Sequence, residues 1–410
     1  MAGKMQQFNE SVVIRSLRRF RDRYIPSGGK VVHGAAPVAH TGGDDSSLAF
    51  MDSLPVDVQF LIMTLLSPVD ICHLGATSHY WRAMIRDQLL WRYFLLRDMP
   101  RWTSIDHVSM PRLQSLDAPL SSEEQSLEDG EESGDTEKGP KHDYMAEYLR
   151  GCPACRQRWL PPRPPYEVVT SFLQSLVPSA EPRYAMYGPG MEELDVSMVT
   201  RLMHAPDVLP VSGIPQRQIN GVGSGISYIF NNQHKFNILT LYSTNRAERE
   251  RARVEQQRVS NKLFTSEGTD QSGCPVFSPA PQVQEVCQVV DGFIYVANAE
   301  RDERGEMETE AAQIRAVVSS AWGSASRPLL VLSCIATEDP EVVNTTSLGS
   351  SGTRTRGRRK TPCVDMAKRL CLPQLPNPWM VQDTVAESLS GLLDGVSWLL
   401  KCSGVKLYSS

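Results

Sequence analysis

Apolar positions near residues 55–66 recur with the period of a helix rather than the alternation of a strand. Pro55 favours the first turn of a helix, and Ser67-Pro68 interrupts the pattern. The spacing therefore predicts a helix that begins near Pro55 and ends before Ser67. The apolar residues that share one stripe of this helix are Val58, Ile62, Leu65 and Leu66.

Capping residues predict three further short helices between residues 67 and 97. Ser67 can accept from free amides, and Asp70 stands where a capping box places its carboxylate. Gly75 is expected to end this second helix, the Thr77-Ser78 pair can cap a third, and Asp87 opens a fourth. The apolar residues of these helices are Ile71, Leu74, Trp81, Met84, Ile85, Leu90, Trp91, Phe94 and Leu95.

A run of apolar and capping positions is the most specific signature in the chain. Its members are Leu54-Pro55, Ile62, Leu65-Leu66-Ser67-Pro68, Asp70-Ile71, Leu74, Ser78, Tyr80-Trp81, Asp87 and Leu90-Trp91-Arg92. Together they resemble an F-box, the module that docks a substrate receptor onto the Skp adaptor of a cullin-RING ubiquitin ligase. About 45 residues are too few to bury so many apolar side chains among themselves, so something must cover the remainder.

The resemblance implies a surface that binds the Skp adaptor. The residues expected to form or support it are Leu54, Pro55, Val58, Ile62, Leu65, Leu66, Pro68, Ile71, Leu74, Trp81 and Trp91. A helical subdomain that packs only on its own chain is the other interpretation.

From residue 183 onward, short apolar strands alternate with helical segments. Two strands are nearly continuous apolar runs, which is typical of a parallel sheet covered on both faces. The predicted fold class is multidomain α + α/β: a helical module, then an α/β domain with a mostly parallel sheet. The expected strands are 184–187, 226–230, 236–242, 292–297, 328–334 and 379–382, and the expected helices 246–263, 310–318 and 386–400.

The order of these strands, with a hairpin near the start, resembles an atypical small-GTPase domain. A phosphate-binding loop needs Gly-x4-Gly-Lys-Ser/Thr, but the turn at 187–195 has no lysine and carries three carboxylates. Each would repel a phosphate at about 4 Å by roughly 1 kcal/mol even with water-like screening. The family's Asp-x-x-Gly is replaced at 243–246, and its Asn-Lys-x-Asp at 334–337. We therefore expect no cofactor; a nucleotide-binding switch protein is the alternative.

Both halves together resemble a family of F-box proteins with a degenerate GTPase-like domain. The segments that carry the resemblance are LWRYFLLRDMP, PRYAMYGPGMEEL, NNQHKFNILTLYST and VVDGFIYVANAE. It implies a non-catalytic subunit of an SCF (Skp-cullin-F-box) ubiquitin ligase, with cullin and RING subunits as partners through the Skp adaptor. It also implies protein substrates, among them telomeric repeat-binding factor and D-type cyclins, that are ubiquitinated and degraded.

An amphipathic, Arg-rich segment precedes the F-box-like motif. Contact with a protein, an anionic membrane surface and a mitochondrial presequence are the three interpretations of such a helix. The resemblance implies homodimerisation, although the family's regulatory Ser-Pro site has no counterpart before Ser67-Pro68. The residues predicted to dimerise are Val13, Leu17, Phe20 and Tyr24.

Composition separates folded from linking segments. The stretch 121–137 holds eight acidic residues and no basic one, which cannot bury a core. The predicted domains are an arm at 1–30, a linker at 31–50, the F-box at 51–98, a helical linker at 99–165 with a disordered acidic segment at 117–141, and the GTPase-like domain at 166–402 with a disordered insertion at 341–362.

Bulk properties add little to these predictions. The net charge of -5 over 410 residues is no signature of nucleic-acid binding, and no apolar run is long enough for a membrane helix. We expect a location in the cytoplasm, with the nucleus as a second one. The basic cluster 354–360 is either a nuclear-import or nucleic-acid patch or a solvated loop, and Cys152 and Cys155 are expected to be ordinary thiols without a metal.

Overall fold

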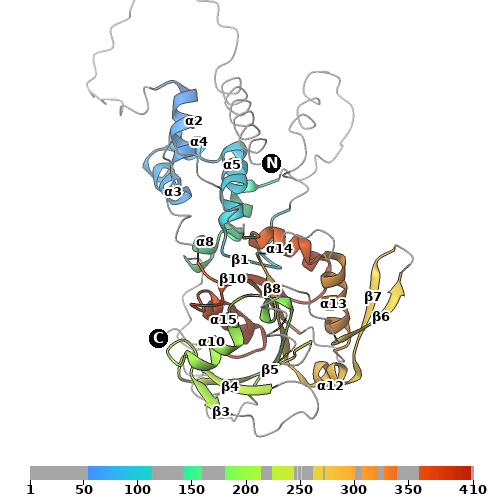
Figure 1. Cartoon of the computed structure of the whole chain (residues 1–410). Coiled ribbons are helices and arrows are strands. Elements are labelled where there is room, and N and C mark those ends of the chain that lie inside the picture. Colours follow the sequence, from blue (N-terminus) through green and yellow to red (C-terminus); the bar gives the residue numbers. More distant parts are fainter. Residues whose placement is uncertain are drawn as a thin grey trace, which may run out of the picture. The chain divides into compact units, whose positions relative to one another are not determined.

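The computed structural model describes residues 54–112, 116, 142–158, 181–213, 224–243, 247, 251, 262–270, 273–300, 307–321, 327–338 and 360–407. These residues form two compact units (Figure 1). The first contains the described residues of 54–99 and 111–150, and the second those of 100–110 and 151–407.

Several predictions lie outside the described residues. These are the arm and its residues Val13, Leu17, Phe20 and Tyr24, the linker 31–50, the acidic segment 117–141 and most of the helix expected at 246–263. Leu263, the last residue of that expected helix, lies in a turn.

Four short helices open the first unit. The predicted caps are confirmed: Ser67 Oγ accepts from the Asp70 amide at 3.1 Å, Ser78 Oγ from Trp81 at 3.2 Å, and Asp87 Oδ1 from Leu89 at 2.8 Å. These bonds satisfy amides that helix starts leave unpaired. The helices are α2 (Val56–Leu65), α3 (Pro68–Thr77), α4 (His79–Met84) and α5 (Gln88–Asp98), followed by the 3-10 helix η2 (Met99–Arg101).

A later helix, α7 (Tyr144–Gly151), covers part of the apolar surface that the four helices cannot bury alone. Its Tyr148 ring lies 5.5 Å from that of Trp91, and its hydroxyl donates to Asp98 at 2.8 Å. The guanidinium of Arg92 donates to the Leu116 carbonyl at 2.5 Å. The chain therefore completes the core around α5 with residues more than 20 positions further on.

Gly75 does not end the second helix, contrary to the prediction. Helix α3 continues to Thr77 because Gly75 is buried at a close approach rather than at a cap. A Cβ at this position would lie 2.1 Å from Ile85 Cδ1, so only glycine lets the segment after α4 pack against α3.

An eight-stranded sheet forms the centre of the second unit, in the order β1-β10-β9-β8-β2-β5-β4-β3. The five central strands, from β10 to β5, run parallel, while β1, β4 and β3 are antiparallel to their neighbours. The predicted fold class, with its mostly parallel sheet and early hairpin, is confirmed. The strands are β1 (Ser104–Asp106), β2 (Arg183–Tyr187), β3 (Val211–Gly213), β4 (Ser224–Phe230), β5 (His234–Thr240), β8 (Gly292–Asn298), β9 (Leu329–Ile335) and β10 (Trp379–Val385).

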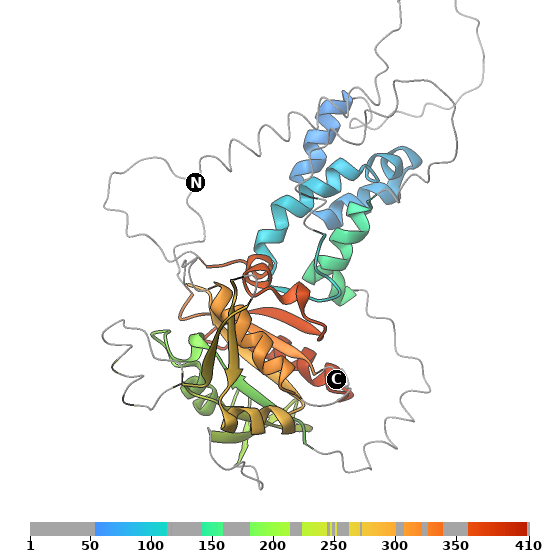
Figure 2. The same ribbon diagram turned by 90° about the vertical axis from the view of Figure 1, so that its right-hand side faces the viewer.

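Helices cover both faces of this sheet (Figures 1 and 2). On one face, α10 and α15 contribute to a core that includes Met186, Val296 and Leu332. On the other, α13 packs against α12 and α14 and carries the separate hairpin β6–β7. The remaining elements are α8 (Pro153–Arg158), η4 (Pro189–Met191), α10 (Met198–His204), β6 (Phe264–Thr269), β7 (Pro275–Pro279), α12 (Pro281–Val289), α13 (Met307–Ser319), α14 (Cys363–Arg369), η7 (Leu372–Gln374) and α15 (Leu392–Cys402).

The last helix begins later than the predicted residue 386. Leu389 and Gly391 have φ angles of 58° and 80°, so the chain makes a left-handed turn before α15 starts at Leu392. A Cβ at Gly391 would lie 2.0 Å from the Asp383 carbonyl oxygen, which explains the glycine.

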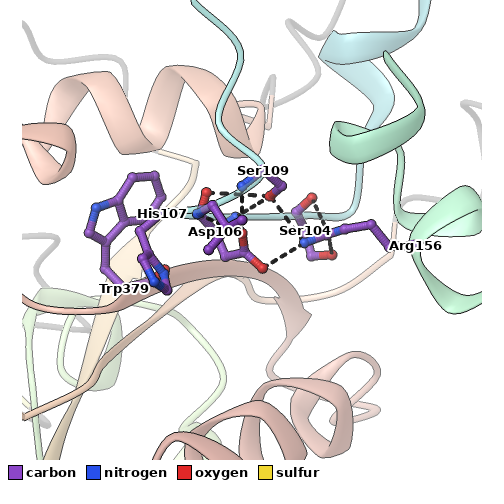
Figure 3. A network of polar contacts seen from close by, with 7 residues as sticks. Ser104, Asp106, His107, Ser109, Arg156 and Trp379 are labelled. Carbon is purple, nitrogen blue, oxygen red and sulfur yellow. Dashed lines mark hydrogen bonds and ion pairs between the residues drawn. The ribbon is translucent and has the colours of Figure 1, made fainter. Parts of the chain in front are cut away.

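Strand β1 belongs to the second unit, although the prediction assigned its residues to a linker. It pairs with β10, from Ser104 opposite Gln382 to Asp106 opposite Met380. The guanidinium of Arg156, in α8, donates to the Asp106 carboxylate at 2.9 Å and to the Ser104 carbonyl at 3.1 Å (Figure 3). It also donates to the hydroxyls of Ser104 and Ser109. The Arg156 side chain thus holds α8 and the segment 104–109 together at the edge of the sheet.

We predict that Arg156→Ala loosens this edge. Loss of charged, half-buried hydrogen bonds should cost about 2 kcal/mol and speed amide hydrogen exchange in 104–106. Arg101→Ala, which removes an exposed arginine of the same unit, is the control and should leave exchange unchanged. Equal exchange in both variants would contradict the role given to Arg156.

Candidate functional site

Helix α2 has apolar side chains on its outer as well as its inner side. Val58, Leu61 and Leu65 are 39%, 45% and 77% exposed, and Ile62 between them is half-buried. These four residues recur at positions i, i+3, i+4 and i+7 and so share one face, which we call the α2 stripe. The opposite side buries Phe60 and Met63 in the unit.

Polar contacts hold α2 with its stripe turned away from the core. Gln59 donates to the Leu54 carbonyl at 3.1 Å and accepts from the Tyr80 hydroxyl at 2.5 Å. At the other end, Arg97 donates to the carbonyls of Thr64 at 2.8 Å and Leu66 at 3.4 Å. A cation at the carboxyl end of a helix is favourable because it meets unpaired carbonyls.

Arg97 is itself fixed by two neighbours. Its guanidinium pairs with Asp98 at 2.6 Å, and hydrogen bonding to that carboxylate raises the pKa of Arg97. Its Cζ lies 4.6 Å from the centre of the Phe94 ring, a cation–π distance. The end of α2 is thereby anchored to α5.

The predicted docking residues fall into two groups. Those that reach the surface of the unit are Val58, Leu65 and Pro55, which are exposed, and Leu54, Ile62, Leu66, Pro68 and Leu74, which are half-buried. The other three, Ile71, Trp81 and Trp91, are buried.

The prediction allowed each of these residues either to form the docking surface or to support it, and burial leaves only the supporting role for Ile71, Trp81 and Trp91. These side chains are 0%, 4% and 0% exposed and cannot themselves touch a partner. Trp91 donates from its indole nitrogen to the Ile85 carbonyl at 2.5 Å and so ties α5 to the end of α4. They belong to the core beneath the exposed predicted residues. The prediction also omitted Leu61. Its position three residues after Val58 places it on the same face of a helix, so the spacing could have identified it.

In the second unit, the turn after β2 stands where a phosphate-binding loop would lie. Its amides at Met191 and Glu192 donate to the carbonyls of Gly188 and Pro189 within the turn. A Cβ at Gly188 would lie 2.5 Å from the Val296 carbonyl oxygen, so the turn rests directly on β8. A phosphate cradle needs open amides, and the amides of residues 191–193 already donate within the turn.

A carboxylate of this turn reaches the loop after β5. Glu192, 5% exposed, accepts from the Ser243 amide at 2.6 Å and from the Ser243 hydroxyl. Two further carboxylates behave similarly: Glu193 accepts from Asn298 at 3.3 Å, and Glu300 from the Ala336 amide at 2.7 Å. All three positions predicted to lack nucleotide chemistry are thus in contact with the protein's own carboxylates.

A buried thiol and a lysine of the second unit share one carboxylate. Cys363 donates to Asp383 at 3.0 Å, and Lys360 pairs with the same carboxylate at 2.6 Å. Burial raises the pKa of the Cys363 thiol, which keeps it protonated and unreactive at neutral pH. Cys152, directly before α8, is half-buried, and Cys155, within α8, is buried.

The end of the basic insertion is ordered, contrary to the prediction of disorder through residue 362. Besides the Lys360 ion pair, the Thr361 amide donates to the Ala299 carbonyl at 2.9 Å, and Pro362 precedes the first residue of α14. Among the residues that the structure describes, no cluster of His, Cys, Asp or Glu side chains is suited to a metal ion. Within the same ranges, no helix has the length and hydropathy needed to cross a membrane.

Comparison with known proteins places both units in one family. A model of the F-box-like family matches residues 51–97. F-box only protein 4 of Bos taurus is 47% identical over 369 residues, which are 90% of this chain and 87% of that protein. The human protein of the same name is 47% identical over 359 residues, 87% of this chain and 84% of its own length. The chain belongs to the F-box only protein 4 family.

A solved structure of the small GTPase Arl6 from Trypanosoma brucei is also similar. It matches 55% of this chain and 98% of its own length, at 11% identity and a TM-score of 0.29. The fold of the second unit is therefore assigned from its own strand order and not from this match. Membership in the family makes the α2 stripe part of an F-box.

We predict that substitution of a buried F-box residue destabilises the unit, whereas substitution of an exposed one does not. Trp91→Ala should lower the free energy of unfolding by about 3–5 kcal/mol because it leaves a large cavity. Leu65→Ala, at a 77% exposed position, should change it by less than about 0.5 kcal/mol. Denaturant unfolding measures both, and a similar loss in the two variants would contradict the assignment of Leu65 to the surface.

Proposed function

We propose that this chain is the substrate-recognition subunit of an SCF-type ubiquitin ligase and that its F-box unit docks on the Skp adaptor through the α2 stripe. The observation that carries the proposal is the exposure of Val58, Leu61 and Leu65 within the matched F-box segment. Contiguous apolar residues on a surface mark interaction sites, because burying them against a partner is favourable.

In this proposal the chain performs no chemistry of its own. The F-box unit connects it, through the Skp adaptor, to cullin and RING subunits. The second unit binds a protein substrate and holds it near a charged conjugating enzyme, which raises the effective concentration of the reactants. Ubiquitinated substrates would then be degraded by the proteasome.

The substrate classes in the proposal come from the family resemblance: telomeric repeat-binding factor and D-type cyclins. Homodimerisation through the arm and a location in the cytoplasm and nucleus also belong to the proposal. Each rests on sequence alone, because the arm and the basic cluster up to residue 359 lie outside the described residues.

We predict that Leu61→Glu with Leu65→Glu abolishes binding to the Skp adaptor. Each leucine should contribute about 1.5–3 kcal/mol when buried, so the double variant should bind at least about 100-fold more weakly. Val289→Glu, at an exposed position of α12 in the second unit, is the matched control and should bind normally. Affinity is measured with purified adaptor, and circular dichroism checks that both variants fold. Unchanged affinity in a folded double variant would refute the proposed surface.

The nucleotide-binding alternative makes a separate prediction. Because the turn after β2 uses its amides internally, a titration with a fluorescent guanine nucleotide and magnesium should stay flat up to about 1 mM, a concentration that corresponds to about 4 kcal/mol of binding energy. Saturable binding in the micromolar range would instead favour a nucleotide switch.

A further inference from the structure

The switch point of the sheet lies beside β2, the strand at which the order of connections reverses. Strand β2 pairs with β5 on one side and β8 on the other. In open α/β sheets, ligands bind in the crevice outside the carboxyl ends of the strands at such a point. The crevice in this unit lies between β2 and β8; beside it, on the β5 side of β2, Glu192 in the turn after β2 accepts hydrogen bonds from Ser243 in the loop after β5.

We propose that the Glu192 carboxylate is a built-in anion beside this crevice, which takes the place of an external ligand and holds the turn after β2 to the loop after β5 in one state.

The chemistry of the contact supports this role. An ionised carboxylate only accepts hydrogen bonds, and Ser243 offers two donors, its amide and its hydroxyl. Both residues are buried, at 5% and 8% exposure, where a charged hydrogen bond is stronger than in water. An unpaired carboxylate there would be costly, so the contact is unfavourable to open.

The neighbouring contacts extend the same arrangement along the edge of the sheet. Glu193 bonds Asn298 at the end of β8, and Glu300, after β8, bonds the Ala336 amide after β9. Carboxylates thus link the turn after β2 to β5 and β8, and the loop after β8 to that after β9. A bound nucleotide would make such links only while it stayed bound, whereas these links are made by the chain's own side chains.

The consequence goes beyond the proposed function, because it holds for whatever partner the second unit binds. The loops at the carboxyl ends of the strands keep one conformation without a nucleotide. Binding by this unit is therefore constitutive and has to be controlled elsewhere in the chain or by the partner.

The test is chemical rescue of Glu192→Ala in the full chain by sodium formate, a free carboxylate small enough for the vacated space. Without formate, the variant should unfold about 5 °C below the wild type and exchange the amide of residue 243 at least 10-fold faster. Formate at up to about 0.5 M should recover at least half of the lost melting temperature, relative to sodium chloride at equal ionic strength.

The matched control is Glu387→Ala, which removes a carboxylate that is 51% exposed and faces Arg201 at 3.5 Å. It should melt like the wild type and respond to formate only as the wild type does. A normal melting temperature for Glu192→Ala, or an equal formate response in both variants, would overturn the proposal.

A second variant covers the case in which Glu192→Ala does not fold in chloride. Glu192→Gln keeps an acceptor oxygen but loses the charge, so it should fold and show a smaller acceleration of exchange at residue 243. If Glu192→Gln exchanges at the wild-type rate, the charge has no role and the proposal fails. Because these readouts concern the second unit, they are independent of binding to the Skp adaptor.

Discussion

The F-box unit has too few residues to bury all of its apolar side chains, and the rest of its structure depends on this constraint. The three helices that follow it, α3, α4 and α5, have 6 to 11 residues and cannot surround α2, whose side chains are apolar on both faces. One face enters the core through Phe60 and Met63, and α7 returns from later in the chain to cover part of α5. The other face, the α2 stripe, is left outside. Because exposed apolar surface is costly in water, the proposed docking of a partner on the α2 stripe would gain its energy from the same shortage that limits the unit's own stability.

The second unit has a sheet order whose strand ends bind ligands in other α/β proteins, and here carboxylates of the chain lie at those ends. At the carboxyl ends of the parallel strands, Glu192, Glu193 and Glu300 accept hydrogen bonds from donors at the ends of neighbouring strands or in the loops after them. The turn after β2 also rests on β8 through Gly188. In the sequence, the acidic residues of the turn 187–195 were expected to repel a phosphate. In the structure, two of them, Glu192 and Glu193, accept hydrogen bonds from Ser243 and Asn298. In the proposed function both units bind proteins: the F-box unit leaves apolar surface open, and the second unit holds its loops in place.

The sequence predicted what depends on local chemistry. Caps at Ser67, Ser78 and Asp87, the helices they open and the buried strands were all predictable, because a side chain and its own neighbours decide them. Contacts between distant residues were not. Periodicity marked Trp91 as apolar but could not tell the core from the docking surface. Gly75 resembles a helix end unless Ile85 is known to press on it. Strand β1 has only three residues, and its place at the sheet edge depends on Arg156, 50 residues later.

The central claim is that the outer face of α2 is the surface that the Skp adaptor buries. Hydrogen exchange of the full chain, with and without saturating purified adaptor, tests it most directly. Protection should appear in α2 (Val56–Leu65) and the turn at Leu66–Pro68, while the amides of β8 and β9 keep their rates. Adaptor binding that leaves α2 unprotected, or protection confined to the second unit, would contradict the account.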